Sequence, residues 1–124
     1  MKRTADPLRR AAGVQRSAAR TGFDWPAGDP ALWRKLHEEI RELKAVAGRR
    51  SQAREELGDL LFMAVNLARH LKVDAGAALG AAIRKFERRY AHVMKHARGL
   101  PRKGDPRRLA AMERRWQEAK RRER

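Results

Sequence analysis

Residues 52–71, QAREELGDLLFMAVNLARHL, form the stretch of the chain that decides its fold. The second half of this stretch carries leucine, phenylalanine, methionine and valine on nearly every side. A helix that is apolar all round is normally buried by its neighbours, so the sequence predicts a central, buried helix here. Two acidic residues, Glu56 and Asp59, are exceptions that lie one turn apart within it.

Four amphipathic helices are expected around this central helix. Apolar residues at helical spacing predict them at about 7–20, 30–47, 74–97 and from 105 towards the end of the chain. No segment alternates convincingly with the period of a strand, which makes the predicted fold class all-α, a small bundle of about five helices. We expect a single domain over 1–124, with basic and loose ends at 1–6 and 120–124.

The helix starts and the loop between the first two helices have clear signals. Asp29, Asp74 and Asp105 are expected to cap three helices, and Ser51 to cap the central one. Residues 21–30 contain two prolines and two glycines, which is typical of a loop. The two aromatic residues of this loop are expected to pack onto the helices or, alternatively, to form part of a pocket wall; they are Phe23 and Trp25.

The composition excludes several functional classes. The chain of 124 residues has no cysteine, so disulfides, thiolate metal sites and cysteine nucleophiles are excluded. No apolar run reaches membrane-spanning length, and no hydrophobic segment follows the basic N-terminus, so a cytoplasmic protein without membrane contact is expected. No glycine-rich phosphate loop, Ser-His-Asp set or zinc-type ligand spacing occurs.

The net charge of +16 is unusual for a chain of this length. Such an excess attracts polyanions, including nucleic acid and nucleotides. The surplus is concentrated at the two ends, where residues 1–20 carry six basic residues and one acid, and residues 101–124 carry ten basic residues and four acids. We therefore favour a solvated, arginine-rich surface, with nucleic-acid binding through the termini as the alternative.

Acidic residues occur on two helical faces that should be apolar. Glu39 lies between Leu36 and Leu43 on the apolar stripe of its helix, and Glu42 follows one turn later. A carboxylate facing a core is costly unless it is paired or binds a cation. The i,i+3 pairs Glu39/Glu42 and Glu56/Asp59 would face one another if their helices pack antiparallel.

Four converging carboxylates are best explained by a divalent cation. Oxygen-only ligation suits Mg²⁺, with Mn²⁺ also possible, rather than zinc. The alternative is a structural ion network in which nearby basic residues neutralise the acids: Arg41, Lys44 or Arg54. On the fourth predicted helix, Lys85 and Arg89 lie four residues apart beside the apolar stripe, where they are well placed to bind phosphate oxygens.

Several motifs in the same order resemble the MazG family of nucleoside triphosphate pyrophosphohydrolases. The similarity covers nearly the whole chain and corresponds to the C-terminal repeat of long MazG proteins. It is carried by Glu56 to Phe62 continuing through Val65 to Leu71, by Gly22 to Pro26, by Glu38-Glu39 with Glu42, by Lys85 to Arg89, and by Met112 to Lys120.

The resemblance implies an all-α protein that dimerises through its central helices and hydrolyses nucleoside triphosphates to monophosphate and pyrophosphate. It implies that the Mg²⁺ ligands are Glu39, Glu42, Glu56 and Asp59. It also implies a nucleotide site that contains Lys35, Glu38, Lys85, Arg89 and Trp116. Glu38 is the candidate base or water-positioning carboxylate, and Trp116 either stacks on the nucleobase or belongs to the core.

The chain departs from the family pattern in three places. Ile83 stands where the family usually has asparagine, and Gln52 stands where a basic residue is common. The connection between Glu42 and Glu56 is also a few residues shorter than in the long proteins. Because all four expected ligands are present, we expect activity, either reduced or with an altered substrate preference.

Overall fold

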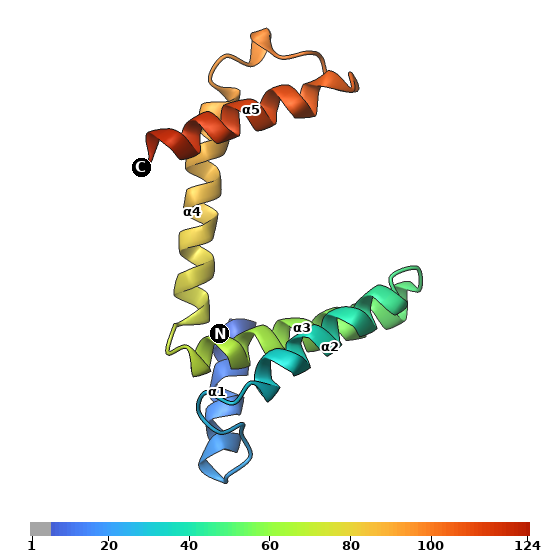
Figure 1. Ribbon diagram of the computed structural model, residues 1–124, viewed down its shortest axis with the longest axis vertical. Coiled ribbons are helices and arrows are strands. Elements are labelled where there is room, and N and C mark those ends of the chain that lie inside the picture. The colour runs from blue at the N-terminus through green and yellow to red at the C-terminus, as the bar shows by residue number, and fades with distance from the viewer. Residues whose placement is uncertain (1–5) are drawn as a thin grey trace, which may run out of the picture. The chain divides into compact units, whose positions relative to one another are not determined.

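A computed structural model describes residues 6–124, and the described chain is helical without strands (Figure 1). The all-α prediction with five main helices is therefore confirmed, and the predicted helix limits are close to the observed ones. The elements in chain order are α1 (Pro7–Arg20), α2 (Ala31–Ala45), α3 (Arg50–His70), α4 (Ala75–Met94), a short 3-10 helix η1 (Ala97–Gly99) and α5 (Arg107–Arg122).

Aspartate side chains accept hydrogen bonds from backbone N–H groups at the start of three of these helices, as the sequence predicts. An Oδ atom of Asp29 accepts from the backbone N–H of Ala31 at 2.8 Å, and Asp74 accepts from Ala77 at 2.7 Å. Asp105 accepts from the N–H of Arg107 at 2.8 Å. These bonds satisfy backbone donors that have no partner within the helix.

The predicted Ser51 cap is wrong. Helix α3 begins one residue earlier, at Arg50, with Arg49 in the cap position and no side-chain cap. Arg49 is extended there, and its carbonyl accepts the first helical bond, from Ala53 at 2.8 Å. The tight connection from α2, closed by a bond from the Arg49 N–H to the Val46 carbonyl, starts the helix before Ser51.

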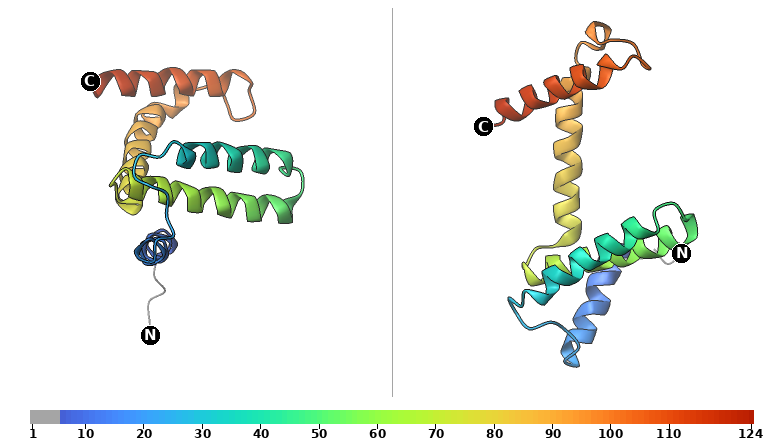
Figure 2. Two further views of the ribbon diagram at one scale, coloured as in Figure 1. Left: turned by 60° about the horizontal axis from the view of Figure 1, so that its bottom comes forward. Right: turned by 45° about the vertical axis from the view of Figure 1, so that its right-hand side comes forward.

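The chain divides into two compact units, the first ending at Ala78 and the second spanning Leu79–Arg124. In the first unit, α2 and α3 are antiparallel and lie side by side, joined by the short connection at 46–49 (Figure 2). Helix α1 packs against α3 in the same unit. The buried apolar side chains of this unit are Leu32, Met63 and Val65.

The second unit is built from most of α4, η1 and α5. Its buried apolar residues are Val93, Leu100 and Ala119. Arg115 on α5 donates to the carbonyl of Val93 at 2.8 Å and to that of His96 at 3.1 Å, which fixes α5 against the end of α4. The prediction of one domain over 1–124 stays a prediction.

The C-terminal segment that the sequence predicts to be loose, 120–124, is mostly helical and contacts α4. Residues 120–122 continue α5, and the carboxylate of Glu123 accepts from Arg88 at 3.0 Å and from Arg89 at 2.9 Å. Residues 1–5, which make up most of the other expected loose end, lie outside the described residues.

Helix α3 is buried on one face only, so the prediction of a fully buried helix is wrong for the single chain. Leu57, Leu61 and Phe62 are 47%, 54% and 42% exposed. The reason is that α1 and α2 cover only part of its circumference. Phe23, expected to pack onto the helices, is also exposed, whereas Trp25 is half-buried.

Candidate metal and nucleotide site

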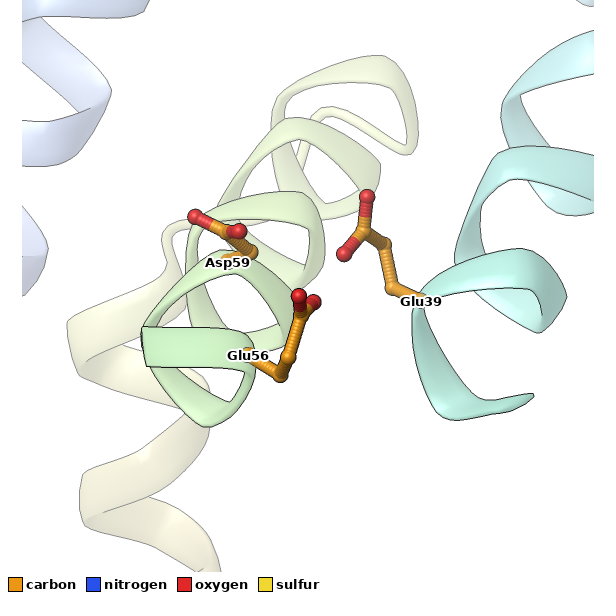
Figure 3. A group of neighbouring side chains, drawn as sticks. All are labelled: Glu39, Glu56 and Asp59. Atoms are coloured by element: carbon orange, nitrogen blue, oxygen red, sulfur yellow. The ribbon is translucent and has the colours of Figure 1, made fainter. Parts of the chain in front are cut away.

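The antiparallel pairing of α2 and α3 brings three acidic side chains into one space. Glu39 projects from α2 towards α3, from which Glu56 and Asp59 project (Figure 3). Each residue offers a carboxylate oxygen, and these three oxygens lie within 4.8 Å of one another. The sequence predicts this convergence because the i,i+3 spacing places Glu56 and Asp59 on one side of α3.

Two carboxylate oxygens of this cluster are buried without a hydrogen-bond partner in the described chain: Oε2 of Glu39 and Oε2 of Glu56. Glu39 is only 6% exposed, and its other oxygen lies 3.3 Å from the ammonium group of Lys35. A buried carboxylate oxygen without a donor is energetically costly. The cluster therefore has free ligand atoms, as a cation site requires.

The alternative of a structural ion network is not supported by the geometry. Within residues 6–124, no ion pair joins the acids of the cluster to Arg41, Lys44 or Arg54, and all three basic side chains are exposed. The basic side chain that contacts the cluster is Lys35, through Glu39. Hydrogen bonding to Glu39, followed by the charge of Glu38, raises the pKa of Lys35 above its usual value.

Glu42, the fourth residue expected to bind metal, lies outside the close group of three. Its pKa is nevertheless raised, first by desolvation and then by the negative charges of Glu39, Glu56 and Glu38. Glu42 is therefore close enough to the three clustered carboxylates to be repelled by their negative charges. Glu38 is about half exposed and lies 3.4 Å from the Lys35 ammonium group.

The donor set fits a hard divalent cation. All donors are carboxylate oxygens, the type that Mg²⁺ and Mn²⁺ prefer, and no histidine or cysteine belongs to the group found in the described chain. The two buried carboxylate oxygens without a hydrogen-bond partner support this fit, because a bound cation would coordinate both of them.

The other three residues expected at the nucleotide site belong to the second unit. The guanidinium of Arg89 lies 5.5 Å from the ring centroid of Trp116, within the range of a cation–π contact. Trp116 also contacts Phe86, with ring centroids 5.4 Å apart. Arg89 donates to Glu123 as well, whereas Lys85 is exposed. The Trp116 ring and the Glu123 carboxylate together hold Arg89 in position.

Sequence reasoning missed a polar network that joins the loop at 21–30 to α3. Both oxygens of Asp24 accept from Arg69 at 3.1 Å, and one lies 3.0 Å from Nε2 of His70. Arg69 also donates to Gln15 at 3.1 Å and to Asn66 at 2.8 Å. Asp24 and Arg69 are 45 residues apart, so no local pattern links them. Both residues lie in segments that carry the family resemblance, but nothing local in the sequence pairs them.

Comparison with known proteins places this arrangement in a family. The model of the MazG nucleotide pyrophosphohydrolase domain matches residues 29–94, which is more than half of the chain. The chain belongs to the MazG nucleotide pyrophosphohydrolase domain family. The matched MazG region contains the whole acidic cluster, together with Lys35, Lys85 and Arg89.

Curated relatives extend the similarity beyond that region. A nucleoside triphosphate pyrophosphohydrolase of Escherichia coli (strain K12) is 42% identical over 127 residues, which cover 98% of this chain and 47% of the relative. The nucleoside triphosphate pyrophosphohydrolase/pyrophosphatase MazG of Thermotoga maritima is 46% identical over 78 residues, 62% of this chain and 29% of the relative. The chain therefore spans about half the length, or less, of these MazG relatives.

No helix in the described part of the chain is both long and apolar enough to cross a membrane.

Proposed function

We propose that this chain hydrolyses nucleoside triphosphates to nucleoside monophosphate and pyrophosphate with a divalent cation, Mg²⁺ or alternatively Mn²⁺. The observation that carries the proposal is the convergence of Glu39, Glu56 and Asp59 with two buried carboxylate oxygens left without a partner. Membership of the MazG domain family and the names of the two relatives support the same chemistry.

Glu39, Glu56 and Asp59 would hold the cation, with Glu42 beside them as the fourth carboxylate. A bound divalent cation would polarise a phosphate oxygen and lower the pKa of an attacking water.

Glu38 is the candidate general base. It lies next to Glu39 in the sequence but is about half exposed, so its carboxylate is accessible to water. We propose that it accepts a proton from the attacking water or orients that water. The ammonium group of Lys35 lies 3.4 Å from the Glu38 carboxylate and 3.3 Å from that of Glu39, so it links the candidate base to the acidic cluster.

Basic residues would bind the negatively charged substrate. Once a cation neutralises Glu39, the ammonium group of Lys35 is free to donate to a phosphate oxygen. From the second unit, the resemblance assigns Lys85 and Arg89 to phosphate binding, and Trp116 supports Arg89 through its ring. We further propose that the chain works in the cytoplasm as a homodimer or higher homo-oligomer.

The test is pyrophosphate release from a panel of ribo- and deoxyribonucleoside triphosphates, with Mg²⁺ and with EDTA. Glu39→Gln should lower the rate by about 100-fold or more, because even residues that only support metal ligands cost 10–100-fold when changed. Glu55→Gln, an exposed residue on α3, is the matched control and should retain the wild-type rate. Equal rates for the two variants would overturn the ligand assignment.

If wild-type protein releases no pyrophosphate from any triphosphate, the proposed activity is wrong. The alternative to test is then nucleic-acid binding through the basic termini, measured as salt-dependent retention of DNA or RNA.

A further inference from the structure

The second unit, Leu79–Arg124, carries most of the positive charge of the chain. It contains sixteen basic residues and five acids, which gives a net charge of +11. The first unit is longer, but its fifteen basic residues and ten acids give only +5. The basic surplus is therefore concentrated in one folded unit, which makes that unit attractive to polyanions.

Helix α5 has one face of exposed arginines. Arg107, Arg114 and Arg121 recur every seven residues, so they lie within about 40° of one another around the helix. All three are exposed, and we call them the arginine face. The opposite face packs against α4, where the ring centroids of Trp116 and Phe86 are 5.4 Å apart. The arginine face is therefore turned to solvent.

The acids at the end of α5 are turned towards α4 instead. Glu123 accepts from two arginines of α4, and Glu118 lies 3.9 Å from a histidine of the same helix, whereas Glu113 is exposed. Among residues 6–124, no ion pair joins two residues of α5, although Arg114 and Glu118 have the i,i+4 spacing for one. A solvated surface, which the sequence favours, normally mixes the two signs of charge. Here they are separated.

The guanidinium groups of the arginine face are available to bind anions. In the part of the chain that the structure describes, neither Arg114 nor Arg121 takes part in an ion pair. Arg107 lies 2.8 Å from Asp105, but its side chain is still 83% exposed. The planar fork of an arginine can donate to two oxygens of one phosphate group, which a lysine ammonium cannot match.

The length of the arginine face indicates the class of ligand. It extends about 21 Å, at a rise of 1.5 Å per residue. A single phosphate group reaches one arginine of such a row, whereas duplex nucleic acid carries one charge per about 1.7 Å of its axis and can contact all three.

The residues between the arginines narrow the ligand class further. Ala110 and Gln117 lie there, both exposed, and neither offers an aromatic ring on which an unpaired base could stack. A helix that binds a lipid surface would carry large apolar side chains beside its basic ones, and the arginine face has none. The backbone of a duplex therefore fits this surface better than a single strand or a membrane does.

We propose that the arginine face of α5 binds the sugar-phosphate backbone of duplex nucleic acid without regard to base sequence. Each arginine contacts phosphate oxygens, and the counterions released from the duplex drive the binding. Contacts of this kind carry no sequence information. The proposed binding uses no residue of the acidic cluster and does not depend on hydrolysis.

The test is fluorescence anisotropy of a labelled duplex, titrated with the full chain in EDTA at several salt concentrations. We expect binding that weakens steeply as salt rises. Combining Arg107→Gln, Arg114→Gln and Arg121→Gln should reduce the slope of log K against log salt by about 3 and weaken binding about 100-fold at about 0.1 M salt. Changing the same three residues to lysine keeps their charges, so the slope should stay within about 1 of wild type.

The matched control removes the same charge from the first unit, as Arg10→Gln, Arg34→Gln and Arg50→Gln together. These three arginines are exposed, and the slope for this variant should stay within about 1 of wild type. Circular dichroism checks the helical content of each variant. Equal losses for the two glutamine variants would show that net charge and not the arginine face binds the duplex, which would overturn the proposal.

Other ligands test the class of partner. A second duplex of unrelated sequence should bind within about threefold of the first. DNA and RNA duplexes share the backbone chemistry, and a comparison of the two identifies the one that α5 prefers. The proposal is wrong if wild-type protein binds no duplex at about 0.05 M salt. It is also wrong if the protein binds vesicles of phosphatidylcholine and phosphatidylserine in preference to the duplex.

This proposal and the proposed hydrolysis fail separately. The glutamine variant of the arginine face should release pyrophosphate at the wild-type rate, because none of its three changes lies in the candidate metal and nucleotide site. Duplex binding without pyrophosphate release would overturn the hydrolysis alone. Pyrophosphate release without duplex binding would overturn the arginine face alone.

Discussion

Glu56 illustrates how a single residue can carry function at the expense of stability. Its Oε2 is buried without a donor, and the carboxylates of Glu39 and Asp59 lie within 4.8 Å. In the absence of a cation, these negative charges repel one another, and the buried oxygen loses hydration without gaining a bond. The same atoms become favourable once a divalent cation binds.

Glu56→Gln is therefore expected to stabilise the metal-free protein by about 1 kcal/mol, because the substitution removes a charge and adds amide hydrogens that can bond Glu39. Thermal unfolding in EDTA and in Mg²⁺ provides the measurement. Wild-type protein should unfold at a higher temperature in Mg²⁺ than in EDTA, whereas Glu56→Gln should lose most of this difference. Glu55→Gln is again the matched control, since it is exposed on the same helix.

The opposite result would contradict the metal assignment. If Glu56→Gln destabilises the protein in EDTA and wild-type stability does not depend on Mg²⁺, the carboxylates contribute as a structural network and not as ligands.

At the scale of elements, the contact between Asp24 and Arg69 fastens the loop at 21–30 to α3. The Arg69 guanidinium, followed by His70 and the Trp25 backbone N–H, outweighs desolvation and holds the pKa of Asp24 far below its usual range. Both side chains are mostly shielded from water, with 15% of Arg69 and 21% of Asp24 exposed. This pairing should therefore contribute measurably to folding.

Asp24→Asn is expected to lower the free energy of unfolding at pH 7 by about 2 kcal/mol, the usual value for hydrogen bonds to a charged group. The contribution of a carboxyl with a depressed pKa is present above its unfolded pKa, here 3.8, and is lost as the pH falls towards the folded value. The difference between wild type and Asp24→Asn should thus shrink below about pH 4. Urea unfolding of both proteins at pH 7 and pH 3 measures it.

Asp29→Asn separates this effect from a general loss of negative charge. Asp29 caps α2 through a backbone N–H, and asparagine caps helices about as well, so that variant should change stability by less than about 0.5 kcal/mol. A similar loss for Asp24→Asn and Asp29→Asn, or a difference that does not depend on pH, would rule out the Asp24–Arg69 pair as its cause.

The helices were predictable because their signals are local. Asp29, Asp74 and Asp105 cap helices through hydrogen bonds that span only two or three residues. The i,i+3 spacing of Glu56 and Asp59 likewise determines which side of α3 they share. The Asp24–Arg69 pair joins residues 45 positions apart, so it depends on how α1, the loop and α3 pack.

At the scale of the whole molecule, the exposed apolar surface was the least predictable feature. The sequence marks α3 as apolar all round, but it does not say whether its neighbours belong to the same chain or to another. Leu57 and Leu61, one turn apart on α3, are about half exposed in the single chain. Contiguous exposed leucines of this kind are typical of a surface that binds another protein.

We therefore expect the homodimer implied by the MazG resemblance to bury Leu57 and Leu61. Leu61→Glu should convert the protein to a monomer, because a carboxylate in a two-fold apolar interface is buried twice without a partner. Leu61 is 54% exposed within the chain, so the substitution should not unfold the monomer. Sedimentation equilibrium gives the mass, and circular dichroism tests the helical content.

Leu109→Glu is the matched control for this prediction. Leu109 is 66% exposed on α5, and the same change of charge there should leave the dimer intact. Monomers for Leu109→Glu but not for Leu61→Glu would move the interface to α5. A wild-type monomer would mean that the exposed leucines of α3 need a different partner, and the dimer would then be no part of the mechanism.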